Sequence, residues 1–207
     1  MKARIHAFFW ILVLFVSGCI PTAKVKKGKE DLGYLETQST LPVYFVYPKT
    51  KVARNETESE HVKELNEVEE GVGNEWYAAW QKQKEEHYEP IFIEAMNKAL
   101  KEVPIKVVRV TEKALKNGNV GEKLNTIPGY YGVVEVTAMK SGRIKGNREA
   151  GTDVTTQLAI RHKKSEEMRT LLKTFWYKTK GKGGGLEEGF RKNGGGHGKY
   201  IAKEFSS

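Results

Sequence analysis

The chain contains one cysteine, and the residues before it suggest a specific chemical modification. Cys19 directly follows the small residues Ser17 and Gly18. Val16 precedes this pair and ends an apolar segment that covers residues 7–16. Because the chain has a single thiol, one molecule cannot form a disulfide, a cysteine zinc cluster or a second reactive thiol site.

The first 18 residues have the three-part layout of an export signal. Lys2 and Arg4 give a basic start, an apolar stretch follows, and small residues precede the cysteine. A transmembrane helix needs roughly 20 apolar residues, whereas only ten stand between His6 and Ser17. The sequence therefore predicts cleavage. The alternatives are an ordinary secretory signal with an unrelated cysteine and an uncleaved anchor.

Residues 16–19 resemble the lipobox of bacterial lipoprotein precursors. The resemblance implies that Val16, Ser17 and Gly18 are recognition positions and that the Cys19 sulfur takes up a diacylglyceryl group before the peptide is cut. It also implies a lipid anchor of acyl chains such as palmitate, each buried methylene contributing about 0.8 kcal/mol. Ile20 fits sorting to the outer membrane, with the protein facing the periplasm.

We expect four segments along the chain. Their bounds are 1–18 for the signal peptide, 19–40 for the lipidated cysteine and a flexible tether, 41–180 for a globular domain, and 181–207 for a Gly/Lys-rich C-terminal segment. The tether has few apolar residues, so burial cannot offset the entropy that it would lose on ordering.

Two runs of three glycines lie among the basic residues of segment 178–199. Neither run has the Walker spacing or the G-x-G-x-x-G pattern that a phosphate-binding loop requires. The sequence therefore predicts no nucleotide or other cofactor. It favours a mobile basic loop, followed by a short helix over residues 200–205.

The charge balance is basic. Without Lys2 and Arg4, the 35 basic residues become 33 against 26 acidic ones, which gives residues 19–207 a net charge of +7. This excess favours anionic partners, such as lipid head groups or peptidoglycan carboxylates. Nucleic acid is excluded by the predicted compartment. The alternative is that lysines only keep the surface well solvated.

Helices and strands alternate over residues 41–180. Thr57 and Glu60 have the spacing of a capping box, which predicts the start of a mostly exposed helix. Strands are expected at 41–48, 105–110, 130–139, 152–162 and 169–179, and helices at 59–70 and 90–103. The predicted fold is α+β (mixed α/β): one main sheet of about five strands with helices packed on it, and a mostly antiparallel C-terminal half.

Trp76, Tyr77 and Trp80 form an aromatic group at helical spacing. Exposed rings of this kind stack on sugars or lie at membrane interfaces. The alternative, which the spacing favours, is the buried stripe of an amphipathic helix.

Residue patterns for catalysis or metal binding are weak. The histidines of the mature chain are never paired at i, i+2 or i+4, so they show no metal-ligand signature. The abundant carboxylates alternate with lysines, as on a solvated helix face. The sequence therefore predicts no catalytic residue, no metal site and no enzyme activity.

The element order is similar to that of small periplasmic lipoprotein domains of the curli-secretion family and the amino-terminal domain of the TolB family. The similarity rests on the strand at 41–48, the helix at 90–103 and the strand at 131–137. It implies a non-enzymatic role in envelope assembly, with a protein partner or self-association. The alternative function is a binding module or hydrolase for an anionic envelope glycan, with Trp76, Trp80 and lysines as contacts.

Overall fold

The main sheet of the protein has six strands in the order β1-β8-β7-β4-β2-β3. The structure is a computed structural model that describes residues 24–25, 33–52, 56–111, 129–140, 144–145, 148–149, 152–162, 174–181 and 185–205. The strands of this sheet are β1 (Lys24–Val25), β2 (Thr40–Val46), β3 (Lys106–Arg109), β4 (Tyr130–Lys140), β7 (Thr152–His162) and β8 (Thr174–Gly181). A separate pair is formed by β5 (Ile144–Lys145) and β6 (Arg148–Glu149).

Strand direction changes across the sheet. β2 pairs in parallel with both β3 and β4, whereas the β4–β7, β7–β8 and β1–β8 pairs are antiparallel. The mixed α/β class with one open sheet and packed helices therefore agrees with the prediction. The expected count of about five strands is slightly off, and the sheet as a whole is mixed rather than mostly antiparallel.

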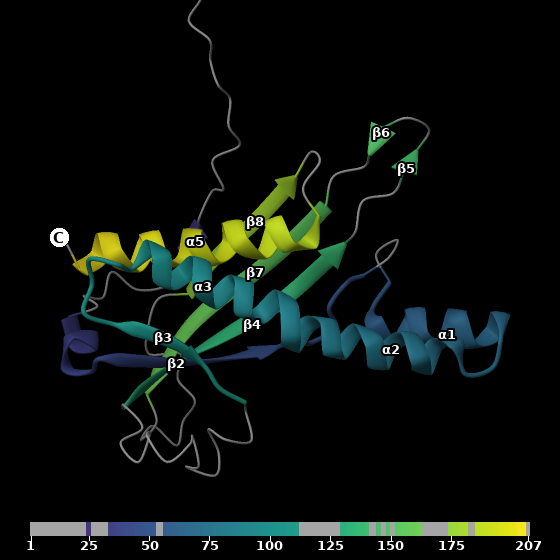
Figure 1. Cartoon of the computed structure of the whole chain (residues 1–207), viewed down its shortest axis with the longest axis horizontal. Coiled ribbons are helices and arrows are strands. Elements are labelled where there is room, and N and C mark those ends of the chain that lie inside the picture. Colours follow the sequence, from purple (N-terminus) through teal and green to yellow (C-terminus); the bar gives the residue numbers. More distant parts are fainter. Residues whose placement is uncertain are drawn as a thin grey trace, which may run out of the picture.

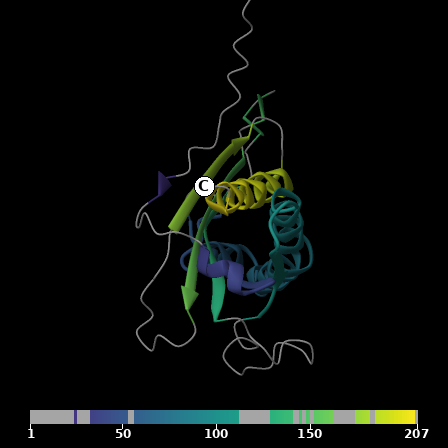
Figure 2. The same cartoon turned by 90° about the vertical axis from the view of Figure 1, so that its left-hand side faces the viewer.

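Two helices, α3 (Glu89–Ala99) and α5 (Leu186–Phe205), lie side by side on one face of this sheet (Figures 1 and 2). Alternate strand residues point toward them, as the two-residue period of a strand requires. The buried core includes Phe92 and Met96 from α3, Phe190 and Ile201 from α5, and Val43, Val134, Leu158 and Ile160 from the sheet.

A helical hairpin extends beyond this two-layer core (Figure 1). It consists of α1 (Glu58–Val68) and α2 (Val72–Gln83), which pack against each other. The chain then passes through a π-helical turn, η2 (Lys84–Tyr88), directly into α3. We call α1 and α2 the arm. The capping box of Thr57 and Glu60 is confirmed at its start, and α1 contains no buried residue, as predicted for a mostly exposed helix.

The glycine-rich C-terminal segment is a helix, so the predicted mobile loop is wrong over residues 186–199. α5 buries Gly194 and Gly198 against the backbone of α3, where an added Cβ would lie 2.2 Å from the Phe92 carbonyl oxygen or 2.6 Å from that of Met96. Glycine costs about 1 kcal/mol in a helix relative to alanine. Here it allows two helices to approach more closely than side chains would permit.

Several other expectations can be compared with the structure. Leu35 is buried in the 3-10 turn η1 (Gly33–Thr37), and Lys24–Val25 pair with β8 as strand β1, so both of these parts of the predicted flexible tether belong to the fold. The helix expected over 90–103 ends earlier, at Ala99, and the strand over 152–162 has the predicted bounds.

The signal peptide and Cys19 lie outside the described residues. No helix in the described ranges combines the length and apolar character that crossing a bilayer needs.

Candidate binding site at the base of a helical arm

A hollow at the surface lies where β2 ends and the arm begins. Its volume is about 690 Å³. Ligands of open α/β sheets commonly bind beyond the carboxyl ends of parallel strands, and β2 is the central parallel strand. The lining residues are Tyr47, Lys49, Thr50, Thr57, Glu58, Ser59, Glu60, Val62, Asn74 and Tyr77.

The wall after β2 is fixed by hydrogen bonds to β4. Lys49 has a φ of 50°, in the left-handed region, and turns the chain. The buried hydroxyl of Thr50 then donates to the Val136 carbonyl oxygen at 2.6 Å. The backbone of Lys51 continues along β4 by donating to the Thr137 carbonyl and accepting from Met139 N–H. The segment that leads to α1 therefore has a defined position.

The capping box forms a second part of the wall. Thr57 Oγ1 accepts from the backbone N–H of Glu60 at 3.3 Å, and Glu60 Oε2 accepts from the backbone N–H of Thr57 at 2.7 Å. The hydrogen bonds from Thr57, first from its backbone, lower the pKa of the exposed Glu60 carboxyl. Such reciprocal bonds fix the first turn of a helix and therefore the direction in which α1 leaves the site.

An ion pair between the buried Lys84 and Glu58, which lines the hollow, joins the arm to the core. Lys84 is 1% exposed, and its ammonium lies 2.8 and 3.1 Å from the two carboxylate oxygens of Glu58. Trp80 Nε1 also donates to Glu58 Oε1 at 2.9 Å. Burial lowers the pKa of Lys84, while the hydrogen bond and charge of Glu58 act in the opposite direction. Lys84 is the first residue of the π-helical turn η2, directly after α2.

A second charged pair continues this network across the strand ends. The Tyr47 hydroxyl donates to Glu89 Oε1 at 2.8 Å, and Arg109 Nε donates to Glu89 Oε2. The Lys84 ammonium lies 4.1 Å from the centre of the Tyr47 ring, a cation–π contact. Burial raises the pKa of Glu89, and Arg109 opposes this shift. Burial and the nearby Glu89 raise the pKa of the Tyr47 hydroxyl, which is therefore a hydrogen-bond donor at neutral pH.

The three predicted aromatic contacts have different environments. Trp76 and Trp80 are half-buried and stacked, with ring centres 5.5 Å apart. His61 meets the Trp76 ring edge-on. Tyr77 is 43% exposed and lines the hollow. Of the three, only Tyr77 lines the hollow, whereas Trp76 stacks on Trp80, and Trp80 also packs against Tyr88 and the core.

The lining suits a polar, hydroxyl-bearing ligand. It offers the hydroxyls of Thr57 and Ser59, the amide of Asn74 and the rings of two tyrosines. The sequence pattern pointed to Tyr77 but not to Tyr47, which lies in the apolar run that was assigned to a strand. The Glu58–Lys84 pair was also missed, because 26 residues separate its members and no local pattern links them.

Among the described residues, one group of three side chains has atoms suited to hold a metal ion. It consists of Glu56, His61 and Glu64, around the first turns of α1.

No family model and no curated protein matches the chain. Among solved structures it is similar to a PelC dodecamer from Paraburkholderia phytofirmans, with a TM-score of 0.43 and 11% identity over 86% of this chain and 96% of that one. For a leucine-to-methionine variant of that dodecamer, the TM-score is 0.40 and the sequence identity is 10%, over 85% of this chain and 96% of that one. For a Xanthomonas campestris protein of family DUF330, the TM-score is 0.33 and the sequence identity is 10%, over 90% of this chain and 94% of that one. These scores are too low to transfer a function.

Proposed function

We propose that the protein is a lipid-anchored component of the bacterial cell envelope with a structural or assembly role and no enzymatic activity. The observation that carries the assembly role is the projecting arm. α1 has no buried residue, and Val68 at its end is 83% exposed. A projecting helical hairpin whose first helix is exposed in this way offers a surface on which a protein partner or a second copy can pack.

The base of the arm supports the same proposal. The Glu58–Lys84 pair and the Trp80 hydrogen bond join the arm to η2, and η2 continues into α3 of the core. A surface held rigidly loses less conformational entropy when a partner binds. The lipobox residues 16–19 supply the proposed anchor, and the tether would set the distance between the membrane and the arm.

A photo-cross-linker at position 68 would test the assembly role in the membrane-bound protein. We expect it to capture a defined envelope protein or a second copy, because Val68 lies at the proposed contact. The same cross-linker at Lys101, which is also exposed but lies at the end of α3, is the matched control. Equal capture at both positions, or none at position 68, would contradict the proposal.

A glycan-binding role is the second candidate, and the hollow with Tyr47 and Tyr77 is the observation that favours it. Its charged lining residues are Lys49, Glu58 and Glu60, so the lining is net negative and suits a neutral glycan better than an anionic one. Sedimentation with an insoluble neutral glycan, lost in Tyr77→Ala at unchanged melting temperature, would support this role. Trp80→Ala is a poor test, because Trp80 also holds Glu58.

A further inference from the structure

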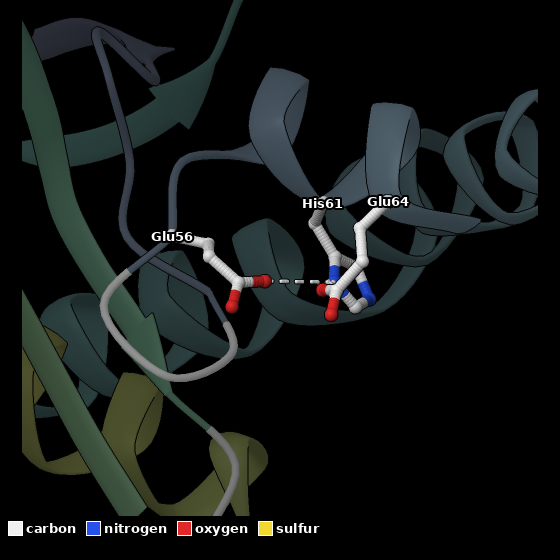
Figure 3. Close-up of side chains that lie close together, drawn as sticks. All are labelled: Glu56, His61 and Glu64. Carbon is white, nitrogen blue, oxygen red and sulfur yellow. Dashed lines mark hydrogen bonds and ion pairs between the residues drawn. The ribbon is translucent and has the colours of Figure 1, made fainter. Parts of the chain in front are cut away.

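Three side chains with metal-binding atoms converge at the start of α1 (Figure 3). Glu56 comes from the loop before the helix, and His61 and Glu64 lie three residues apart on α1. The capping box fixes where the helix begins, so it also fixes the position of the loop carboxylate relative to the helix. A loop residue and two helix residues thus share one site.

Both carboxylates approach the same imidazole nitrogen. Glu56 Oε2 lies 3.3 Å from His61 Nδ1, and Glu64 Oε2 lies 3.8 Å from it. Zinc binds nitrogen and oxygen ligands at about 2.0–2.2 Å, so two ligand atoms of a tetrahedral site are about 3.3 Å apart. The first separation matches this value, and a small rotation of the half-exposed Glu64 side chain would correct the second.

The imidazole ring is held in place by its neighbours. It meets Trp76 edge-on, with ring centres 4.7 Å apart at 80°, and Trp76 stacks on Trp80. The side chains of His61, Glu56 and Glu64 are 18%, 25% and 50% exposed, so water can reach the site. Three protein ligands and an accessible water form the four-coordinate arrangement that zinc adopts when one position stays open.

The charges also fit a divalent cation. Two carboxylates beside a neutral imidazole carry a charge of −2, which a divalent ion neutralises. Imidazole and carboxylate together suit zinc, whereas sites for calcium and magnesium use oxygen ligands. The alternative is an ordinary ion pair between histidine and glutamate, which needs no metal.

We propose that Glu56, His61 and Glu64 bind one Zn²⁺ ion through His61 Nδ1 and one oxygen of each carboxylate. The ion would link the loop before α1 to the helix and so stabilise the base of the arm. This inference does not depend on the proposed function.

Titration calorimetry with Zn²⁺ on the metal-free full chain, together with visible absorption after Co²⁺ addition, tests the site. Cys19→Ser is the background for every sample, so that no thiol competes for the metal. We expect one ion per chain and a higher melting temperature with Zn²⁺, since a ligand that binds only the folded state stabilises it. His61→Ala and Glu64→Gln should each abolish the binding and the rise in melting temperature.

The matched control is His87→Ala. His87 also pairs with a carboxylate, Glu187, at 3.4 Å, but it is not part of the three-residue group. This variant should bind Zn²⁺ as the parent chain does. The proposal is overturned if the parent chain shows no saturable binding, if Glu64→Gln binds normally, or if His87→Ala loses binding equally. Because Glu64 is half-exposed, Glu64→Gln decides the outcome even if His61→Ala fails to fold.

Discussion

Lys84 lies in the protein interior, where Glu58 and Tyr47 surround its amino group. Its ammonium is bound by both oxygens of Glu58 and lies over the Tyr47 ring. A buried ion pair adds little net stability compared with an apolar pair, but removing one partner leaves an uncompensated charge. The pair therefore matters mainly because neither residue can be lost alone.

We expect Lys84→Met to lower the free energy of unfolding by up to about 3–5 kcal/mol, because Glu58, whose side chain is only 12% exposed, would lose its cation. Urea denaturation would measure the loss. Lys82→Met is the matched control, since Lys82 pairs with Glu86 at the exposed surface and such pairs are worth at most about 1 kcal/mol. An equally stable Lys84→Met variant would show that the network does not hold the base of the arm.

His197 predicts a pH dependence of stability. It is fully buried, its Nε2 shares a hydrogen bond with the Thr156 hydroxyl at 3.0 Å, and burial lowers its pKa to about 3. The unfolded chain takes up this proton near pH 6.5, whereas the folded chain does so only near pH 3. The stability contribution is therefore complete above pH 6.5 and is lost as the pH falls toward 3, by up to about 1.4 kcal/mol per pH unit.

Urea midpoints measured across this pH range would test the dependence. His197→Gln should flatten the slope, because glutamine does not titrate. His87→Gln should keep the slope of the parent chain, since His87 is half-exposed. A slope that is the same in all three proteins would assign the acid sensitivity to other groups.

At the scale of elements, the close packing of α5 on α3 explains the positions of the glycines in α5. A Cβ at Gly194 would lie 2.2 Å from the Phe92 carbonyl oxygen, whereas one at Gly195 would meet only the Ala95 carbonyl oxygen, at 3.9 Å. We expect Gly194→Ala to destabilise the fold by about 1–3 kcal/mol through overpacking. Gly195→Ala should be neutral or stabilising by up to about 1 kcal/mol, because alanine favours the helix. Thermal unfolding would compare them, and equal losses would contradict close packing of α5 on α3.

The same helix shows where reading the sequence succeeds and where it fails. The strand at 152–162 and the capping box at Thr57 follow from local patterns of two or four residues, and both are predicted correctly. Glycine runs usually indicate flexible chain, so residues 186–199 of α5 were missed and only its last turns, over residues 200–205, were predicted as helix. A signal was nevertheless present: Phe190, Asn193, His197 and Ile201 repeat every three or four residues and are all buried. The candidate site was only partly predictable, since pairing Glu58 with Lys84 requires the packing of α1 on α2.

At the scale of the whole molecule, the sheet, the arm and the proposed anchor have separate tasks. α3 and α5 bury one face of the sheet and supply the core. The arm leaves this core at the carboxyl end of β2, where the hollow lies. The segment before β2 reaches the core at Leu35, so the proposed tether is shorter than residues 19–40. The flexible tether would limit how far the arm can reach from the membrane without fixing that distance.

The anchor itself gives the last prediction. We expect Cys19→Ser to remove labelled palmitate from the protein and to release it from membranes washed with concentrated salt. Salt is needed because a net charge of +7 on residues 19–207 can hold the protein on anionic lipids, and salt screens that attraction but not acyl insertion. Ser17→Ala keeps a small residue before the cysteine and should stay labelled and membrane-bound. Retention of Cys19→Ser after the salt wash, with the palmitate label lost, would show that the apolar segment 7–16 stays uncleaved in this variant, whereas persistence of the label would contradict the lipid anchor.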